Sequence, residues 1–245
     1  MRLSPTMSDK DPSEGMRINR FLSEAGVASR RGADRIIEDG RVTIDGEVAV
    51  LGDKVFPEND VCFDGKPVVR ETCDVILAFN KPPGITSTSD REDDRNVIDY
   101  IGYHKRIYSI GRLDKDSEGL LLMTNNGDLA DKIMRSRYEH EKEYIVTVSK
   151  DVTSEFIKGM ANGVPILETV TKKCFVEMTG SMEFRIILKQ GLNRQIRRMC
   201  EHFGYDVVRL QRVRIMNIKL GNLKEGCYRD ITKMERDDLY RQLKL

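Results

Sequence analysis

Tryptophan is absent from this sequence, and histidine occurs only three times. The five cysteines are scattered and form no Cys-x-x-Cys pair, so neither a zinc site nor a disulfide framework is predicted. We therefore expect reduced thiols, a cytoplasmic location and no bound metal.

The sequence also lacks a long apolar run and an excess of either charge. No stretch approaches the roughly 20 residues that a membrane-spanning helix needs, and residues 1–15 lack the apolar segment of a signal peptide. We expect a disordered tail there. The 41 Lys and Arg nearly balance the 40 Asp and Glu, so attraction to a polyanion requires local clusters of basic side chains. No heptad or apolar patch is evident, so a monomer is expected.

Residues 16–70 are predicted to form a small unit of helices and hairpins. Apolar side chains between residues 18 and 25 recur at helical spacing, and Ser29 can cap a second helix. Asp45-Gly46 and Asp64-Gly65 are typical of tight hairpin turns. The helical half is rich in arginine, which forms either a solvated face or an RNA-binding surface. The arginines are Arg17, Arg20, Arg30, Arg31, Arg35 and Arg41.

A larger unit is predicted over residues 74–245. Short apolar segments predict strands, among them residues 164–171 and 207–215, and a helix with one apolar face follows Arg194. Thr232 and Glu235 have the spacing of a capping box. The strand at 207–215 also carries several arginines, which are predicted to add to a basic surface. They are Arg209, Arg212 and Arg214.

The segment around Asp114 has the strongest functional pattern. Gly111-Arg112-Leu113-Asp114 leads through a polar turn into the apolar run of residues 120–123, which predicts a buried strand. A carboxylate just before such a strand is fixed by rigid backbone and faces the loop side, where catalytic groups usually lie. The plain alternative is that Asp114 and Asp116 only shape a turn.

This segment, with the words Arg-Leu-Asp and Ser-Glu-Gly-Leu-Leu-Leu-Met-Thr-Asn, resembles the catalytic motif of the pseudouridine synthases. The resemblance is to the branch named for ribosomal small-subunit synthase A, which also holds large-subunit synthases B, E and F, and it is greatest to the F group. Asn-Lys-Pro-Pro-Gly, ending at Gly84, and Gln-Ile-Arg-Arg-Met, beginning at Gln195, match two further motifs of the family. Residues 16–42 resemble the αL RNA-binding module of a ribosomal protein and of many RNA-modifying enzymes.

The resemblance implies both a fold and an activity. The fold is α+β, with the αL module joined to a domain whose mixed, mostly antiparallel central sheet is flanked by helices. The activity is isomerisation of a uridine in ribosomal RNA, with large-subunit RNA or a pre-ribosomal particle as the partner. No cofactor is implied, because the reaction loses no group.

The resemblance also implies roles for single residues. Asp114 would be the catalytic carboxylate, Tyr144 would pack on the flipped base, and Arg197 would pair with Asp114. Other residues in or beside the motifs would contact substrate or RNA, namely Lys81, Arg112, Leu113, Lys142, Arg194 and Arg198. Leu192 stands where many relatives carry a basic residue.

Two other functions compete with this interpretation. A metal-dependent nuclease could use Asp114 and Asp116 with Asp90, Asp93 or Asp94, because two-metal sites need converging carboxylates. A ribosome-assembly protein could keep the RNA-binding surface without catalysis.

Overall fold

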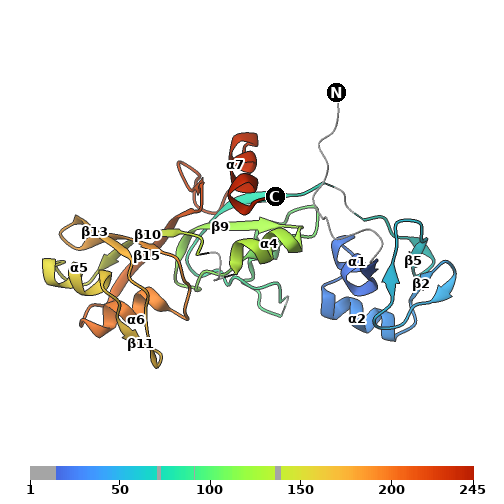
Figure 1. Ribbon diagram of the computed structural model, residues 1–245, viewed down its shortest axis with the longest axis horizontal. Coiled ribbons are helices and arrows are strands. Elements are labelled where there is room, and N and C mark those ends of the chain that lie inside the picture. The colour runs from blue at the N-terminus through green and yellow to red at the C-terminus, as the bar shows by residue number, and fades with distance from the viewer. Residues whose placement is uncertain (1–14, 71–72, 91, 136–138) are drawn as a thin grey trace. The chain divides into compact units, whose positions relative to one another are not determined.

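The computed structural model describes residues 15–70, 73–90, 92–135 and 139–245 (Figure 1). The chain divides into two compact units, Met1–Asp74 with Asn125–Asp128, and Val75–Thr124 with Leu129–Leu245. The predicted tail lies outside the described residues, except for Gly15. No helix of the described part is long and apolar enough to cross a membrane.

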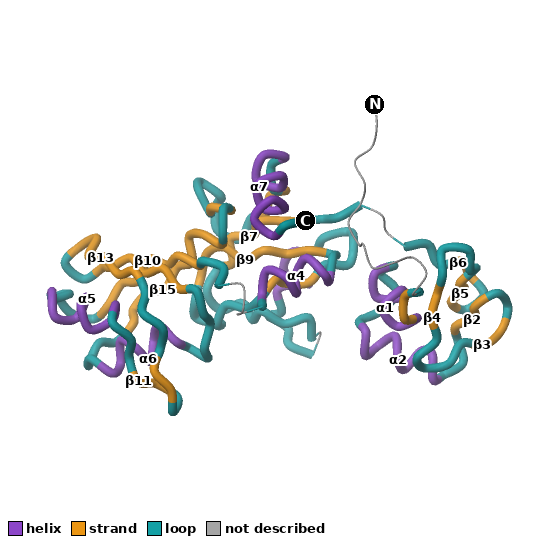
Figure 2. Tube along the Cα trace, viewed as in Figure 1, coloured by secondary structure: helices purple, strands orange, loops and turns teal. Residues whose placement is uncertain are grey.

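The first unit packs two helices on short strands (Figure 2). Its elements are β1 (Met16–Arg17), α1 (Ile18–Glu24), α2 (Arg30–Glu38), β2 (Val42–Ile44), β3 (Glu47–Val48), β4 (Lys54–Val55), β5 (Val61–Phe63) and β6 (Lys66–Pro67). Strands β3-β2-β5-β6 form one antiparallel sheet, and β1 pairs with β4. Ile18 and Leu22 of α1 and Ile37 of α2 are buried in its core.

The local signals of this unit are confirmed. The Ser29 hydroxyl accepts a hydrogen bond from the Gly32 amide and so caps α2. Asp45-Gly46 and Asp64-Gly65 both take positive φ values, as a tight hairpin turn of this kind requires. Because these devices act within a few residues, their sequence patterns are sufficient to locate them.

The remaining elements build the larger unit. The helices are α3 (Val97–Ile101), α4 (Gly127–Met134), α5 (Ser154–Ala161), α6 (Gln195–His202) and α7 (Lys233–Leu243). The strands are β7 (Ile76–Lys81), β8 (Tyr108–Ile110), β9 (Glu118–Thr124), β10 (Lys142–Val148), β11 (Pro165–Ile166), β12 (Thr169–Val170), β13 (Phe175–Gly180), β14 (Glu183–Leu188), β15 (Val207–Ile215), β16 (Ile218–Lys219) and β17 (Tyr228–Asp230).

One large sheet organises this unit, in the strand order β13-β14-β10-β15-β9-β7-β17, with β16 added to β15 and β8 to β9. All of its pairings are antiparallel except that of β9 with β15. The predicted mixed, mostly antiparallel sheet of an α+β protein is therefore confirmed.

Alternate side chains of the sheet enter different apolar clusters. Leu121 and Met123 of β9 pack in the cluster of α3 that also holds Leu113, whereas Leu120 and Leu122 pack with α4 and α7. Farther along the sheet, β10 and β14 bury side chains against α5 and α6. Tyr144 on β10 contacts both the α3 cluster and the α5–α6 cluster, so it marks the junction between them.

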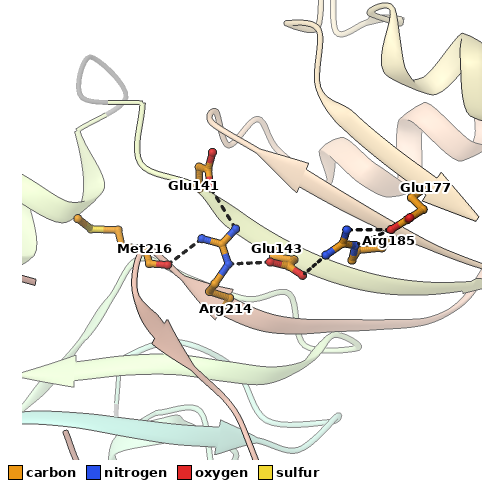
Figure 3. A network of polar contacts seen from close by, with 6 residues as sticks. All are labelled: Glu141, Glu143, Glu177, Arg185, Arg214 and Met216. Carbon is orange, nitrogen blue, oxygen red and sulfur yellow. Dashed lines mark hydrogen bonds and ion pairs between the residues drawn. The ribbon is translucent and has the colours of Figure 1, made fainter. Parts of the chain in front are cut away.

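An ion-pair network crosses four strands, β15, β10, β14 and β13 (Figure 3). Arg214 contacts Glu143 at 2.6 Å and Glu141 at 3.0 Å, and Arg185 contacts Glu143 at 3.3 Å and Glu177 at 2.8 Å. Burial alone would raise the pKa of Glu143, yet the hydrogen bonds from the two arginines hold that pKa below its ordinary value. The network thus joins the four strands with alternating charges.

Residues 164–171 were predicted to form one strand, and this is wrong. The segment folds back on itself, with β11 paired to β12, and the turn residues Leu167 and Glu168 both take positive φ values. Neither is a turn residue by type, so composition alone does not reveal the reversal. The capping box at Thr232 and the strand at 207–215 are confirmed.

Candidate active site

Asp114 lies in the loop between β8 and β9. Its side chain is 35% exposed, and its carbonyl oxygen accepts a hydrogen bond from the Ser117 amide at 3.0 Å, which closes a turn. The carboxylate is therefore accessible to a substrate while the backbone that carries it is ordered by hydrogen bonds.

Buried groups outside the loop fix this backbone further. The Ser87 hydroxyl, itself buried, accepts from the Leu113 amide at 3.1 Å and donates to the Leu113 carbonyl at 2.9 Å. The Gly84 amide donates to the Lys115 carbonyl at 2.8 Å. The residues on either side of Asp114 are thus anchored to the segment that follows β7.

Lys81 was predicted to contact RNA, but its side chain is fully buried in this structure. Its ammonium group donates to the carbonyl oxygens of Pro82 at 2.8 Å, Ile85 at 2.8 Å and Lys115 at 3.2 Å. Burial lowers the pKa of Lys81 to about 8, against the opposing effects of Asp116 and Asp114. Lys81 therefore supports the loop from beneath.

Leu113 is likewise buried, and its side chain packs in the α3 cluster, so its predicted contact with substrate is also corrected. Its place in the motif reflects packing. An apolar side chain next to Asp114 anchors the loop to the core while the carboxylate stays outside.

The predicted ion pair between Arg197 and Asp114 is not formed in this structure. Arg194 is the arginine near the carboxylate, with its Nη1 3.7 Å from the Asp114 Oδ2. Arg197 donates to the Asp116 carbonyl and to the Ser117 hydroxyl, each at 3.4 Å, and to the Val207 carbonyl at 3.2 Å. Its guanidinium contacts the residues that follow Asp114 in the turn and so braces the loop that carries the carboxylate.

Arg194 is placed by an unusual backbone conformation. It precedes α6 in the left-handed region, with φ +50° and ψ +35°. The amide of Leu192 donates to the buried Gln195 side chain at 3.1 Å, which holds the turn before the helix. Helical spacing alone predicts that Arg194 points away from the apolar face of α6. The left-handed turn at Arg194 is what brings its side chain near Asp114.

The other residues that were predicted around the site differ in exposure. Arg112 is exposed, and Arg198 is tied to Asn193 by two hydrogen bonds. Lys142 is half-buried, and burial, followed by the charge of Arg212, lowers its pKa. These three remain predictions as RNA contacts, as does Tyr144 as the stacking residue.

Arginines of the first unit are mostly open to solvent. Arg17, Arg30, Arg31 and Arg35 are exposed and, among the described residues, take part in no ion pair. Arg20 is largely buried and paired with Glu24 at 2.7 Å. The four exposed arginines are therefore the ones available to phosphate groups.

Arg209, Arg212 and Arg214 do not form the basic surface that the sequence predicts. Arg209 and Arg214 neutralise glutamates, and Arg212 is buried. Ser87 is not predicted as a site residue, because it carries no motif signal of its own. The alternation of side chains along a strand could have predicted the burial of Arg212, because it lies on the same face of β15 as the buried Leu210.

In the part of the chain that the structure describes, no group of three or more His, Cys, Asp or Glu could hold a metal ion. Asp93, one of the acids in the nuclease alternative, instead accepts a hydrogen bond from the Arg95 amide at 3.0 Å.

Comparison with known proteins gives independent evidence on the family of this chain. The family profile described as RNA pseudouridylate synthase matches residues 75–202, and that of the S4 domain matches residues 16–61. "Dual-specificity RNA pseudouridine synthase RluF" of Escherichia coli (strain K12) is 52% identical over 232 residues, which cover 94% of this chain and 80% of that protein. An "Uncharacterized RNA pseudouridine synthase" of Aquifex aeolicus (strain VF5) is 36% identical over 239 residues, which cover 94% of this chain and 96% of that one.

A solved structure, "Crystal structure of pseudouridylate synthase", superposes with a TM-score of 0.66 at 27% identity. The match covers 91% of this chain and 99% of that one. Sequence and fold therefore agree on the same relatives.

Proposed function

The chain belongs to the RNA pseudouridylate synthases, and on that premise we propose that it isomerises a uridine of large-subunit ribosomal RNA with Asp114 as the catalytic carboxylate. The observation that supports this most directly is the Asp114 loop, in which an accessible carboxylate stands on a backbone held by buried side chains. Family membership supplies the reaction, and the loop supplies the residue.

The chemistry suits a single carboxylate. Uridine isomerisation breaks the bond between N1 and the sugar, turns the uracil, and forms a bond from C5 to the same sugar carbon, while C5 releases a proton and N1 takes one up. Positive charge develops on the sugar as the first bond breaks, as it does in glycosidases. Three routes are open to Asp114: it attacks the sugar, it attacks the base, or it promotes proton loss from the sugar toward a glycal.

Two arginines support Asp114 in different ways in this proposal. Arg194 lies at 3.7 Å from the carboxylate and keeps a positive charge beside it in a site that is partly open to solvent. Arg197 holds the turn at Asp116 and Ser117.

Tyr144 is proposed as the stacking surface for the flipped base. It lies at the junction of the two apolar clusters, where an aromatic ring is supported from both sides. Extracting a base from a helix costs a few kcal/mol, and stacking on an aromatic ring offsets part of that cost. The exposed arginines of the first unit would hold RNA phosphates and thereby position the protein without reading sequence.

The test maps modification on ribosomal RNA from a strain that lacks this gene. The RNA is incubated with wild-type or Asp114→Asn protein, treated with carbodiimide, and read by primer extension. We expect one new stop in large-subunit RNA with the wild type and none with the variant. Because the E. coli relative is named dual-specificity, transfer RNA is tested in parallel.

Controls separate the alternatives. A stop that persists in the Asp114→Asn reaction would contradict the assignment of Asp114. Binding of RNA without any stop, on naked RNA and on pre-ribosomal particles alike, would instead favour the non-catalytic assembly protein.

A further inference from the structure

The sheet of the larger unit has a seam at the candidate active site. Its one parallel pairing, between β9 and β15, is matched at only two positions, Gln211 with Glu118 and Arg212 with Gly119. The Asp114 loop enters from the β9 side of this seam. Tyr144 lies on β10, which pairs with β15 on the other side.

The two backbones approach closely at Gly119. A side-chain carbon at this position would lie 2.4 Å from the Arg212 carbonyl oxygen and 2.9 Å from its amide nitrogen, which only glycine avoids. Gly119 also has a φ of +98°, which side-chain-bearing residues rarely adopt. The position of β15 at the seam is therefore set at the end of the Asp114 loop.

The Arg212 side chain continues the connection where the backbone pairing stops. Its Nε donates to the Leu120 carbonyl at 2.7 Å, and its Nη1 reaches the Arg112 carbonyl at 3.5 Å. These two acceptors stand on either side of Asp114 in the sequence. One guanidinium thus contacts the loop ahead of Asp114 and the strand β9 that follows the loop.

This arrangement is costly for the fold. Arg212 is 3% exposed, and no carboxylate lies within ion-pair distance of it in the described part of the chain. Its Nη2 is buried without a hydrogen-bond partner among the same residues. Burying an unpaired charge destabilises a protein, and an apolar residue of similar volume would cost less. Stability alone does not explain this residue.

We propose that Arg212 is a positioning residue that sets the placement of Asp114 relative to Tyr144. Arg212 is the residue paired with Tyr144 in the β10–β15 ladder, and its guanidinium contacts the Arg112 carbonyl in the loop of Asp114 and the Leu120 carbonyl in the strand that follows the loop. It therefore links the strand of the tyrosine to the loop of the carboxylate. This inference rests on the proposed function of those two residues.

The test compares Arg212→Lys, which keeps the charge but cannot reach both carbonyls, with Arg212→Gln, which also removes the charge. Arg214→Lys is the matched control, since it changes an arginine of the same strand that contacts carboxylates and not the loop. Hydrogen exchange is measured over residues 111–120, and turnover and KM are measured on the mapped RNA.

In both Arg212 variants we expect exchange at residues 111–120 to rise about tenfold or more, because the loop loses its link to β15. Turnover should fall by about 10- to 100-fold with KM for RNA changed less than about threefold, since misplacement of a reacting group affects the chemical step. The Arg214→Lys protein should match wild type in both.

Unchanged exchange in both Arg212 variants would overturn the proposal, and so would faster exchange with normal turnover. A wild-type protein that forms no pseudouridine would refute the proposed function, while the exchange result would still decide whether Arg212 orders the loop. If the Arg212→Lys protein does not fold, the Arg212→Gln protein still provides the test. Thermal unfolding of each variant shows which proteins are folded.

Discussion

Arg212 and Arg214 lie two residues apart on β15, yet their guanidinium groups meet different acceptors. Arg214 is 17% exposed and contacts the carboxylates of Glu141 and Glu143, in addition to the Met216 carbonyl (Figure 3). Arg212 is buried and contacts the backbone carbonyls of Leu120 and Arg112. An arginine among carboxylates stabilises the sheet, whereas a buried arginine among carbonyls fixes a backbone whose position matters for something else.

The buried side of this comparison extends beyond one residue. Lys81 also donates to carbonyl oxygens beneath the loop, and Ser87 holds both polar groups of the Leu113 backbone. These contacts order the loop that presents the Asp114 carboxylate to solvent. The following changes break one side of the comparison at a time.

Gly119→Ala should have the largest effect. The added carbon meets the Arg212 backbone at 2.4 Å, so the seam must open. We expect activity to fall by at least about 100-fold and the free energy of unfolding to fall by several kcal/mol, roughly 2–4, as for other incompatible backbone positions. Gly46→Ala, at a hairpin turn where an added carbon meets no atom, controls for strain at a positive φ. Equal losses of activity and stability in the two variants would contradict the claim that the close approach of β9 and β15 requires glycine at position 119.

Lys81→Met should change the pH dependence of stability. The folded pKa of about 8 lies below the ordinary 10.5, so the unfolded chain binds the proton more tightly and stability rises with pH between these values. The wild type should gain about 3 kcal/mol over this window relative to Lys81→Met. Urea unfolding at pH 7, 9 and 10.5 measures this gain. If the free energy of unfolding changed with pH in the same way in the two proteins, the pKa of Lys81 would not be lowered in the folded state.

Ser87→Ala should weaken the loop without opening the seam. It removes one hydroxyl and leaves the Leu113 amide and carbonyl without that partner, at a cost of about 1–3 kcal/mol. Turnover is expected to fall by about tenfold, since Asp114 follows directly. Ser89→Ala, an exposed serine two residues later, is the matched control. A turnover change shared by both serine variants would argue against a specific anchor.

Glu143→Gln should have the smallest effect, because it changes only the ion-pair network of Arg214 and leaves the contacts of the Asp114 loop in place. Partly exposed ion pairs of this kind contribute about 1 kcal/mol or less. The pKa of Glu143 is lowered in the fold, so this stabilisation is present above the unfolded pKa and is lost as pH falls through the folded value. The two proteins should differ in unfolding at pH 7, converge at low pH and show equal turnover. A loss of turnover in Glu143→Gln would link the network to the site.

The sequence predicted local features better than long-range ones. Ser29 and Thr232 cap helices as their spacing indicates, because a cap acts within one turn. Asp114 could be located because its motif is contiguous. Arg212 and Ser87 could not be assigned, since both act on the loop from distant segments whose proximity arises only in the folded sheet.

The Arg197 prediction shows the same limit within the site. A motif position indicates which arginine belongs near the loop, but not which acceptor it chooses. In the structure, Arg194 is close to Asp114 because Arg194 itself takes a left-handed conformation just before α6. No pattern of residue types predicts that turn.

The central claim is that Asp114 catalyses uridine isomerisation. The most direct measurement is release of tritium from RNA labelled at uracil C5, because that hydrogen is lost only when C5 becomes bonded to the sugar. The account predicts release of one equivalent per target uridine by the wild type, and a rate at least about 1000-fold lower with an equally stable Asp114→Asn protein. Tritium release at the wild-type rate by Asp114→Asn would contradict it.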